Sequence, residues 1–215
     1  YLVGDENKGM KYMFTMMNDA RLGVGQQGVA IAERAYQQAH AYALERRQGK
    51  GPGTEPGQQA RIIEHADVRR MLMTMKSQIE AMRAMTFVNA AALDRAAAHP
   101  DEGVREYNQK LADLYTPLSK AWGTDLGVEL TSIAIQVHGG MGYVEETGVA
   151  QHYRDARIAP IYEGTNGIQA LDLVGRKLPY DGGAFVKGFI EDLRATAEGL
   201  EGDELASIKD HLVDG

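Results

Sequence analysis

Cysteine is absent from the 215-residue chain, and aromatic residues make up only 7% of it. Without cysteine there can be no disulfide framework, no thiol nucleophile and no metal site held by thiolates. No run of about 18 apolar residues is present, so the sequence contains no candidate membrane-spanning helix. A disordered chain is also excluded, because 44% of the residues are hydrophobic.

The first residues, YLVGDENKGMKYM, neither begin with methionine nor contain the apolar stretch of a signal peptide. We therefore expect a fragment of a longer protein, and a cytoplasmic location. The net charge of −7 is concentrated in residues 191–215, which hold eight acidic residues against two basic ones. The rest of the chain is almost neutral and has no basic stripe, which argues against nucleic acid as a partner.

Helix-favouring residues dominate the sequence and β-branched runs are scarce, so the predicted fold class is all-α. The pattern predicts helices at residues 10–47, 58–98, 103–137 and 164–177, packed as an up-and-down four-helix bundle. A further helical segment is expected to start near residue 184.

Glycine and proline mark the breaks between these helices. The clearest loop is GKGPGTEPG, residues 49–57. Thr116–Pro117 suits an N-cap followed by proline, so a new helix or a kink is expected there. The glycine-rich loop HGGMGY, residues 138–143, ends the third helix, and a short polar segment and a turn at Ala159–Pro160 are predicted to follow it.

Apolar stripes define the expected core. On the first helix, Met13, Phe14, Met16 and Met17 fit either a ligand pocket or the core, and the core is favoured because apolar stripes on helices usually are buried. The stripe of the second helix consists of Val68, Leu72, Met75, Ile79 and Met82, and it drifts around the helix to Met85, Val88 and Ala92. The stripe of the third helix consists of Leu111, Leu114, Leu118, Trp122, Leu126, Leu130, Ile133 and Val137.

A dinucleotide-binding pattern, G-x-G-x-x-G, occurs at residues 23–28, with Glu45 at the distance expected of a ribose-binding acid. The pattern binds a dinucleotide only between a strand and a helix of a parallel sheet. Here it lies in a methionine-rich helical segment, and no strand follows. We interpret these glycines as small residues where two helices cross. Gly123 and Gly127, four residues apart, would likewise allow another helix to approach closely.

A helical bundle can hold a di-iron centre, which needs Glu-x-x-His on two helices. No glutamate in this chain has a histidine three residues later, and the six histidines are scattered. We therefore predict no metal site.

The richest constellation begins at Gln136, just before the glycine loop, where a ligand can approach backbone amides that no side chain shields. Arg154-Asp155-Ala156-Arg157 and then Ile161-Tyr162-Glu163-Gly164-Thr165 follow. By position alone, Glu163 is more readily a helix N-cap than a base facing a pocket, because acidic residues are common at helix starts.

The succession Q-x-x-G-G-x-G-Y, R-D-A-R-I and I-Y-E-G-T resembles the C-terminal domain of the acyl-CoA dehydrogenases, the FAD enzymes of fatty acyl oxidation. The resemblance covers residues 8–178, and several segments are similar to the larger bacterial members, a group that includes 3-methylmercaptopropionyl-CoA dehydrogenase. It implies that residues 1–7 end a β-domain, that 8–178 form the bundle, and that 179–215 are a linker and the first helix of an additional domain.

The resemblance implies a role for each matching residue. Glu163 matches the base that takes the acyl α-proton while the β-hydride passes to flavin N5, so that the acyl-CoA thioester becomes the 2,3-enoyl-CoA. The residues that match FAD contacts are Arg46, Gln136, Gly139, Gly140 and Thr165. All of them except Thr165 would contact the FAD of a neighbouring subunit. The residues that match substrate contacts are Arg21 and Gly164.

Three positions refine this assignment. Some family members carry the base at the position of Ala20, which has no carboxylate, and this strengthens Glu163. The usual aromatic residue is missing from Arg47-Gln48-Gly49, and Gly167 replaces a glutamine, so two flavin contacts of other members are not expected here.

The implied partners are an acyl-CoA substrate, electron-transferring flavoprotein as acceptor, and further copies of the chain in a homodimer or homotetramer. The fragment alone should be inactive and should not bind FAD tightly, because half of the site is missing. Two alternatives stay open. One is a catalytically silent helical module for oligomerisation, and the other is an acyl-CoA oxidase that passes electrons to oxygen.

Overall fold

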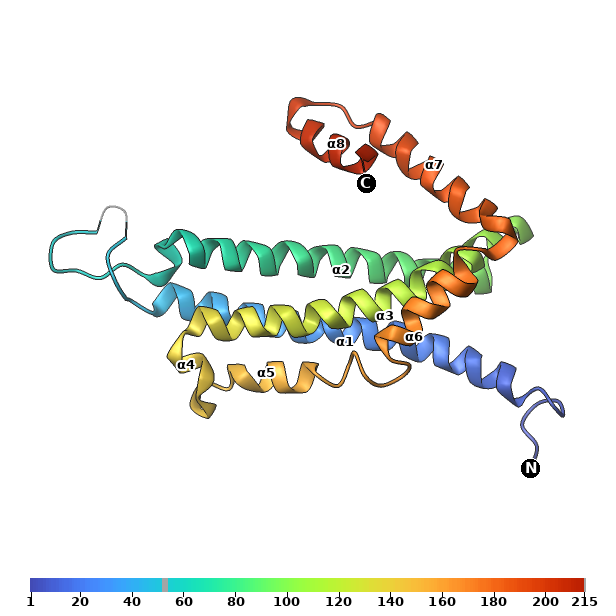
Figure 1. Ribbon diagram of the computed structural model, residues 1–215, viewed down its shortest axis with the longest axis horizontal. Helices are drawn as coiled ribbons and strands as arrows, with labels where there is room; N and C mark the ends of the chain where they lie inside the picture. The colour runs from blue at the N-terminus through green and yellow to red at the C-terminus, as the bar shows by residue number, and fades with distance from the viewer. Residues whose placement is uncertain (52–53, 215) are drawn as a thin grey trace. The chain divides into compact units, whose positions relative to one another are not determined.

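The computed structural model describes residues 1–51 and 54–214, and most of them are helical (Figure 1). The all-α fold class is confirmed, since the β pairing among the described residues is limited to an isolated bridge between Arg47 and Arg61. The helices of the bundle region are α1 (Gly9–Glu45), α2 (Ala66–Ala98), α3 (Glu102–His138), α4 (Gly140–Tyr143), α5 (Val149–Ala156) and α6 (Asn166–Asp172).

The chain divides into two compact units, Tyr1–Ala170 and Leu171–Gly215. In the second unit, α7 (Ala184–Glu198) begins where the sequence predicts a further helix, and α8 (Ala206–Asp214) follows it. The helix predicted at residues 164–177 is present as α6 and a π-helical turn, Leu173–Lys177. None of the helices in the described part of the chain is both long and apolar enough to cross a membrane.

Helices α1 and α3 cross with almost no side chain between them. A Cβ atom added to Gly28 would lie 2.2 Å from the backbone oxygen of Gly123, and one added to Gly25 would lie 2.6 Å from the backbone of α3. Gly127 faces the same crossing, because its Cβ would lie 3.0 Å from the Cα of Gly28. The interpretation of the G-x-G-x-x-G pattern as a crossing point is confirmed for two of its glycines, whereas Gly23 has open space beside it.

The core lies between an alanine-rich face of α1 and the apolar seam of α2. The predicted seam is confirmed up to Met82 and again at Ala92, which is buried. It is wrong at Val88, which is exposed, while Thr86 and Asn89 are buried. Core residues are Val29, Ala32, Ala35, Ala39 and Ala43 from α1, Met71, Leu72, Met75, Ile79 and Met82 from α2, and Leu130, Ala134 and Val137 from α3.

The middle of α3 buries polar side chains, and the prediction that Trp122 is buried there is wrong, whereas Leu114 of the same stripe is buried as predicted. Ser119, Lys120 and Thr124 are fully buried, whereas Trp122 is 37% exposed. The close approach of α1 at the glycine crossing explains the difference, because it turns small and polar positions of α3 inward. Leu130 and Val137, beyond the crossing, are buried as predicted.

Two helix boundaries differ from the prediction. Helix α2 begins at Ala66 rather than at residue 58, because the residues before it pair with the end of α1: the N–H of Ile62 donates to the carbonyl of Arg46 at 2.8 Å. Helix α3 runs through Pro117, so no new helix begins there. The Thr116 hydroxyl donates to the carbonyl one turn earlier at 2.7 Å instead of capping a helix.

The predicted loops are present with two changes. The described part of residues 49–57 forms neither helix nor strand, and residues 52–53 of that loop lie outside the described residues. Residues 140–143 of the expected glycine loop form the single helical turn α4. The supposed polar segment contains α5, which packs on α1 and α3 and buries Val149 and Ala150. The fourth helix of the bundle, beside α1, α2 and α3, is therefore α5.

The N-terminal part of α1 extends away from the other helices of the bundle (Figure 1). Met13 and Phe14 are 39% and 40% exposed, and Met16 is 63% exposed. The favoured assignment to the core is therefore wrong for these three residues, because the neighbouring helices do not reach them, whereas Met17 is half-buried.

Candidate functional site

The residues singled out from the sequence form two groups far apart on the bundle. Arg21 lies beside the turn that carries Glu163 and Gly164, whereas Arg46 lies beside Gln136 at the other end of α1. With a rise of about 1.5 Å per residue, the helix between Arg21 and Arg46 is about 37 Å long. We refer to the first group as the Glu163 turn and to the second as the Arg46 pocket.

Glu163 lies between α5 and α6 in a strained backbone conformation. Its φ is 54° and that of Gly164 is 84°, so two consecutive residues are left-handed. For a residue other than glycine this costs on the order of 1–3 kcal/mol and persists only where the surroundings fix it. The side chain is half-buried, and no hydrogen bond or ion pair within the described residues occupies its carboxylate. The turn thus presents a carboxylate at a fixed place.

The N-cap of α6 is Thr165 rather than Glu163. The backbone N–H of Ile168 donates to the Thr165 hydroxyl oxygen at 3.3 Å, which is the hydrogen bond of an N-cap residue. The helix begins at the next residue, Asn166, and Glu163 precedes the cap by two positions. The favoured positional interpretation of Glu163 as a cap is therefore wrong.

Arg21 packs against the turn from α1. Its side chain is buried, and a Cβ added to Gly164 would lie 3.6 Å from its Nη2 atom. The same Cβ would lie 2.7 Å from Nε2 of Gln169, which donates to the Gly164 carbonyl at 3.2 Å. The left-handed conformation favours glycine at this position, and a Cβ there would displace the Gln169 side chain. A buried cation also packs against this turn.

The Arg46 pocket is a cavity of about 630 Å³ at the end of α1. It brings together Arg46, Gln136, Gly139 and Gly140, four of the five residues predicted to contact FAD. The fifth, Thr165, belongs to the Glu163 turn. Its volume is in the usual range of small-molecule sites, about 300–1,000 Å³. Sequence reasoning missed the aromatic wall, in which Tyr42 stacks on His138 with ring centroids 4.3 Å apart.

The glycines of the Arg46 pocket leave its backbone uncovered. Gly139 ends α3 with φ 60° and ψ −141°, and a Cβ added to Gly139 or Gly140 would have nothing within 4 Å. Burial lowers the pKa of His138, although its hydrogen bond to the Ala134 carbonyl opposes this, so the ring is neutral near pH 7. The permanent positive charge in the pocket is that of Arg46.

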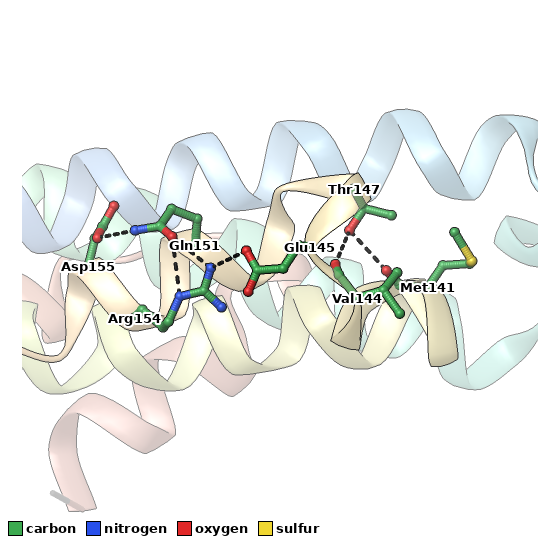
Figure 2. A network of polar contacts seen from close by, with 7 residues as sticks. All are labelled: Met141, Val144, Glu145, Thr147, Gln151, Arg154 and Asp155. Atoms are coloured by element: carbon green, nitrogen blue, oxygen red, sulfur yellow. Dashed lines mark hydrogen bonds and ion pairs between the residues drawn. The ribbon is translucent and has the colours of Figure 1, made fainter.

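The Arg154-Asp155 motif stabilises the chain between α4 and α5. Arg154 Nη2 donates to the Glu145 carboxylate at 3.1 Å and to the Gln151 side chain at 2.7 Å, and Gln151 donates to Asp155 at 2.6 Å (Figure 2). The Thr147 hydroxyl donates to a carbonyl of α4 at 2.9 Å. These contacts join α5 to the segment that follows the glycine-rich turn.

Comparison with known proteins agrees with the resemblance of these motifs. Residues 7–178 match the family model described as acyl-CoA dehydrogenase, C-terminal domain. The chain is 51% identical over 196 residues to 3-methylmercaptopropionyl-CoA dehydrogenase of Ruegeria pomeroyi, and 36% identical over 198 residues to a butyryl-CoA dehydrogenase of Syntrophomonas wolfei. These alignments cover 91% and 90% of this chain but 33% and 32% of the relatives.

Among solved structures, butyryl-CoA dehydrogenase from Megasphaera elsdenii matches with a TM-score of 0.63 and 29% identity, over 81% of this chain and 40% of that one. The chain spans about a third of the length of the curated relatives named above. It belongs to the acyl-CoA dehydrogenase family and contains that family's C-terminal domain.

Proposed function

We propose that this chain is the C-terminal part of an FAD-dependent acyl-CoA dehydrogenase in which Glu163 takes the α-proton of an acyl-CoA thioester. The observation that carries the proposal is the Glu163 turn, which carries the half-buried Glu163 and packs against the buried Arg21 at Gly164. A thioester α-proton is weakly acidic, so its removal needs a well-positioned base and stabilisation of the developing enolate. Gly164 and Arg21 would contact the substrate at this turn.

The Arg46 pocket fits the adenosine-diphosphate half of FAD. Arg46 supplies a cation for the pyrophosphate, Gln136 a polar partner for ribose or phosphate, and Gly139 and Gly140 bare backbone amides. When bound, FAD would accept the β-hydride of the substrate at flavin N5. Thr165, next to Glu163, would lie beside the flavin ring.

The separation of the two groups favours a homo-oligomer, either a homodimer or a homotetramer. Because about 37 Å of α1 separates Arg21 from Arg46, one chain's Arg46 pocket and its own Glu163 turn would serve two different flavins. The pocket of one copy would then meet the Glu163 turn of a neighbouring copy. The isolated chain would lack the rest of each site, and we expect it to be inactive and to bind no FAD tightly.

The experiment that tests the function is a visible spectrum of the full-length protein that contains this chain. We expect bound flavin that is bleached anaerobically by an acyl-CoA and reoxidised slowly in air, with electron-transferring flavoprotein as its natural acceptor. Absence of flavin, or no bleaching by acyl-CoAs of short to long chain length, would contradict the proposal. Rapid reoxidation by oxygen would favour the oxidase instead.

Flavin retention tests the Arg46 pocket. In the full-length protein, Arg46→Ala and Gln136→Ala should each lower the flavin-to-protein ratio after gel filtration, because each removes a polar partner of an anionic or ribose group. The melting temperature of the bundle should change little. Arg47→Ala is the matched control, since the Arg47 guanidinium donates to the Gln59 carbonyl at 3.0 Å and does not line the pocket. Equal flavin content in all three variants would contradict the assignment.

A further inference from the structure

Lys120 is a lysine with no exposed surface, in the middle of α3. Burying an ammonium group is costly unless the group is hydrogen-bonded and its charge is compensated. Its Nζ atom donates to the side-chain oxygen of Asn166 at 2.9 Å. Asn166 follows Glu163 by three residues, so this contact joins α3 to the strained turn.

Asn166 is the residue that connects this turn to α3. Its side-chain nitrogen donates to the Asp125 carboxylate at 2.7 Å and to the Ala121 carbonyl at 3.1 Å. Its backbone N–H donates to the carbonyl of Pro160 at 3.0 Å, which closes the loop that contains Glu163. The amide nitrogen and the amide oxygen therefore both hold the turn in place. The oxygen accepts from Lys120 at 2.9 Å and also lies 3.3 Å from the Thr124 hydroxyl.

Charged groups face Lys120 from three elements: Asp125 from α3, Arg21 from α1 and Glu163 from the turn. Burial lowers the pKa of Lys120 to about 8, and the nearby Arg21 also lowers it, while the charges of Asp125 and Glu163 raise it. Lys120 is therefore mostly protonated at pH 7 and loses its charge as the pH rises through about 8.

We propose that Lys120 is a positioning residue for Glu163, acting through Asn166 to hold the left-handed turn on α3. This inference rests on the proposed function, in which Glu163 is the base. The stiff part of the assembly is the long helix α3, whereas the turn is strained and would relax without its contacts. A displacement of a catalytic group by about 1 Å can lower a rate about 100-fold.

The test is the anaerobic rate of flavin reduction in the full-length holoenzyme, followed by stopped flow over a range of acyl-CoA concentrations. Lys120→Met and Asn166→Ala should each lower the rate at saturation by about 10–100-fold, with flavin content and half-saturating acyl-CoA near the wild-type values. The double variant should be no slower than the slower single variant, because the two residues act through one contact. Lys76→Met is the matched control, since that lysine lies on α2 with a side chain 54% exposed.

The pH profile separates positioning from mere stability. The wild-type rate should fall as the pH rises through about 8, when Lys120 loses its proton and holds Asn166 less firmly. In Lys120→Met the rate should be low throughout, without this fall. A purely structural role predicts a lower melting temperature with an unchanged pH profile.

Several results would overturn the proposal: a wild-type reduction rate in Lys120→Met, losses that multiply in the double variant, or the same fall above pH 8 in Lys120→Met. Should Lys120→Met fail to fold, a wild-type rate in Asn166→Ala overturns it equally. Glu163→Gln, measured in parallel, keeps the two proposals apart. If Glu163→Gln still reduces flavin, the proposed function is wrong; if it does not and Lys120→Met does so normally, only the role of Lys120 is wrong.

Discussion

Glu163→Gln should abolish the bleaching of the flavin by acyl-CoA in the full-length protein, while the fold, the flavin content and acyl-CoA binding stay intact. The amide is nearly isosteric with the carboxylate and can still hydrogen-bond, but it cannot accept the α-proton. We expect the reduction rate to fall about 10⁴-fold or more, at the upper end of what a positioned base contributes.

A stopped-flow reduction trace of Glu163→Gln, recorded beside its melting curve, shows whether Glu163 acts in catalysis or only in the structure of the turn. A purely structural role would lower the melting temperature and leave the rate almost unchanged. Glu80→Gln provides a matched control, because that glutamate lies on α2 with a side chain 59% exposed. Near-normal reduction in Glu163→Gln would show that the base lies elsewhere.

Gly28→Ala should be the most destabilising single methyl addition in the bundle. Its Cβ would lie 2.2 Å from the Gly123 oxygen and 2.7 Å from the Gly123 carbonyl carbon, so the two helix backbones would have to separate. Overpacking of this kind costs about 3 kcal/mol, which outweighs the gain of about 1 kcal/mol from replacing glycine by alanine in a helix. For a chain of this size the net loss of about 2 kcal/mol corresponds to a melting temperature lower by roughly 4–8 °C.

Gly23→Ala is the matched control for this prediction. Gly23 lies on the same helix, but a Cβ there would meet nothing within 4 Å. The variant should therefore be as stable as the wild type or more stable by up to ~1 kcal/mol. Thermal unfolding followed by circular dichroism compares the two, and equal melting temperatures would show that the crossing tolerates a methyl group.

Periodicity predicted the long helices and the first half of the α2 seam, because those features repeat over many turns. It missed α5, since eight residues are too few to establish a repeat. Periodicity also predicted that Trp122 is buried and gave no indication that Lys120 is. Burial at these positions depends on the distance between two helices, which the sequence of neither helix specifies. A lysine buried against Asn166 looks the same in a sequence as one in solvent.

The candidate site was predicted unevenly for a related reason. Spacing alone favoured a helix cap for Glu163, and the resemblance to the family was needed to identify it as a base. The structure adds that Thr165 takes the cap position and that Arg46 and Gln136 line one pocket. Asn166 could have been noticed as an amide directly after the I-Y-E-G-T motif, but its partners on α3 are 41 to 46 residues away along the chain.

The glycine crossing fixes the axial register of α1 against α3. Gly25 follows Arg21 by four residues and Gly123 follows Lys120 by three, so each buried cation lies one helical turn before the point of contact. With backbone against backbone, neither helix can slide or roll without a clash. The glycines of the crossing thus set the positions of Arg21 and Lys120 around Glu163. A bulkier residue at the crossing would shift both cations relative to Glu163.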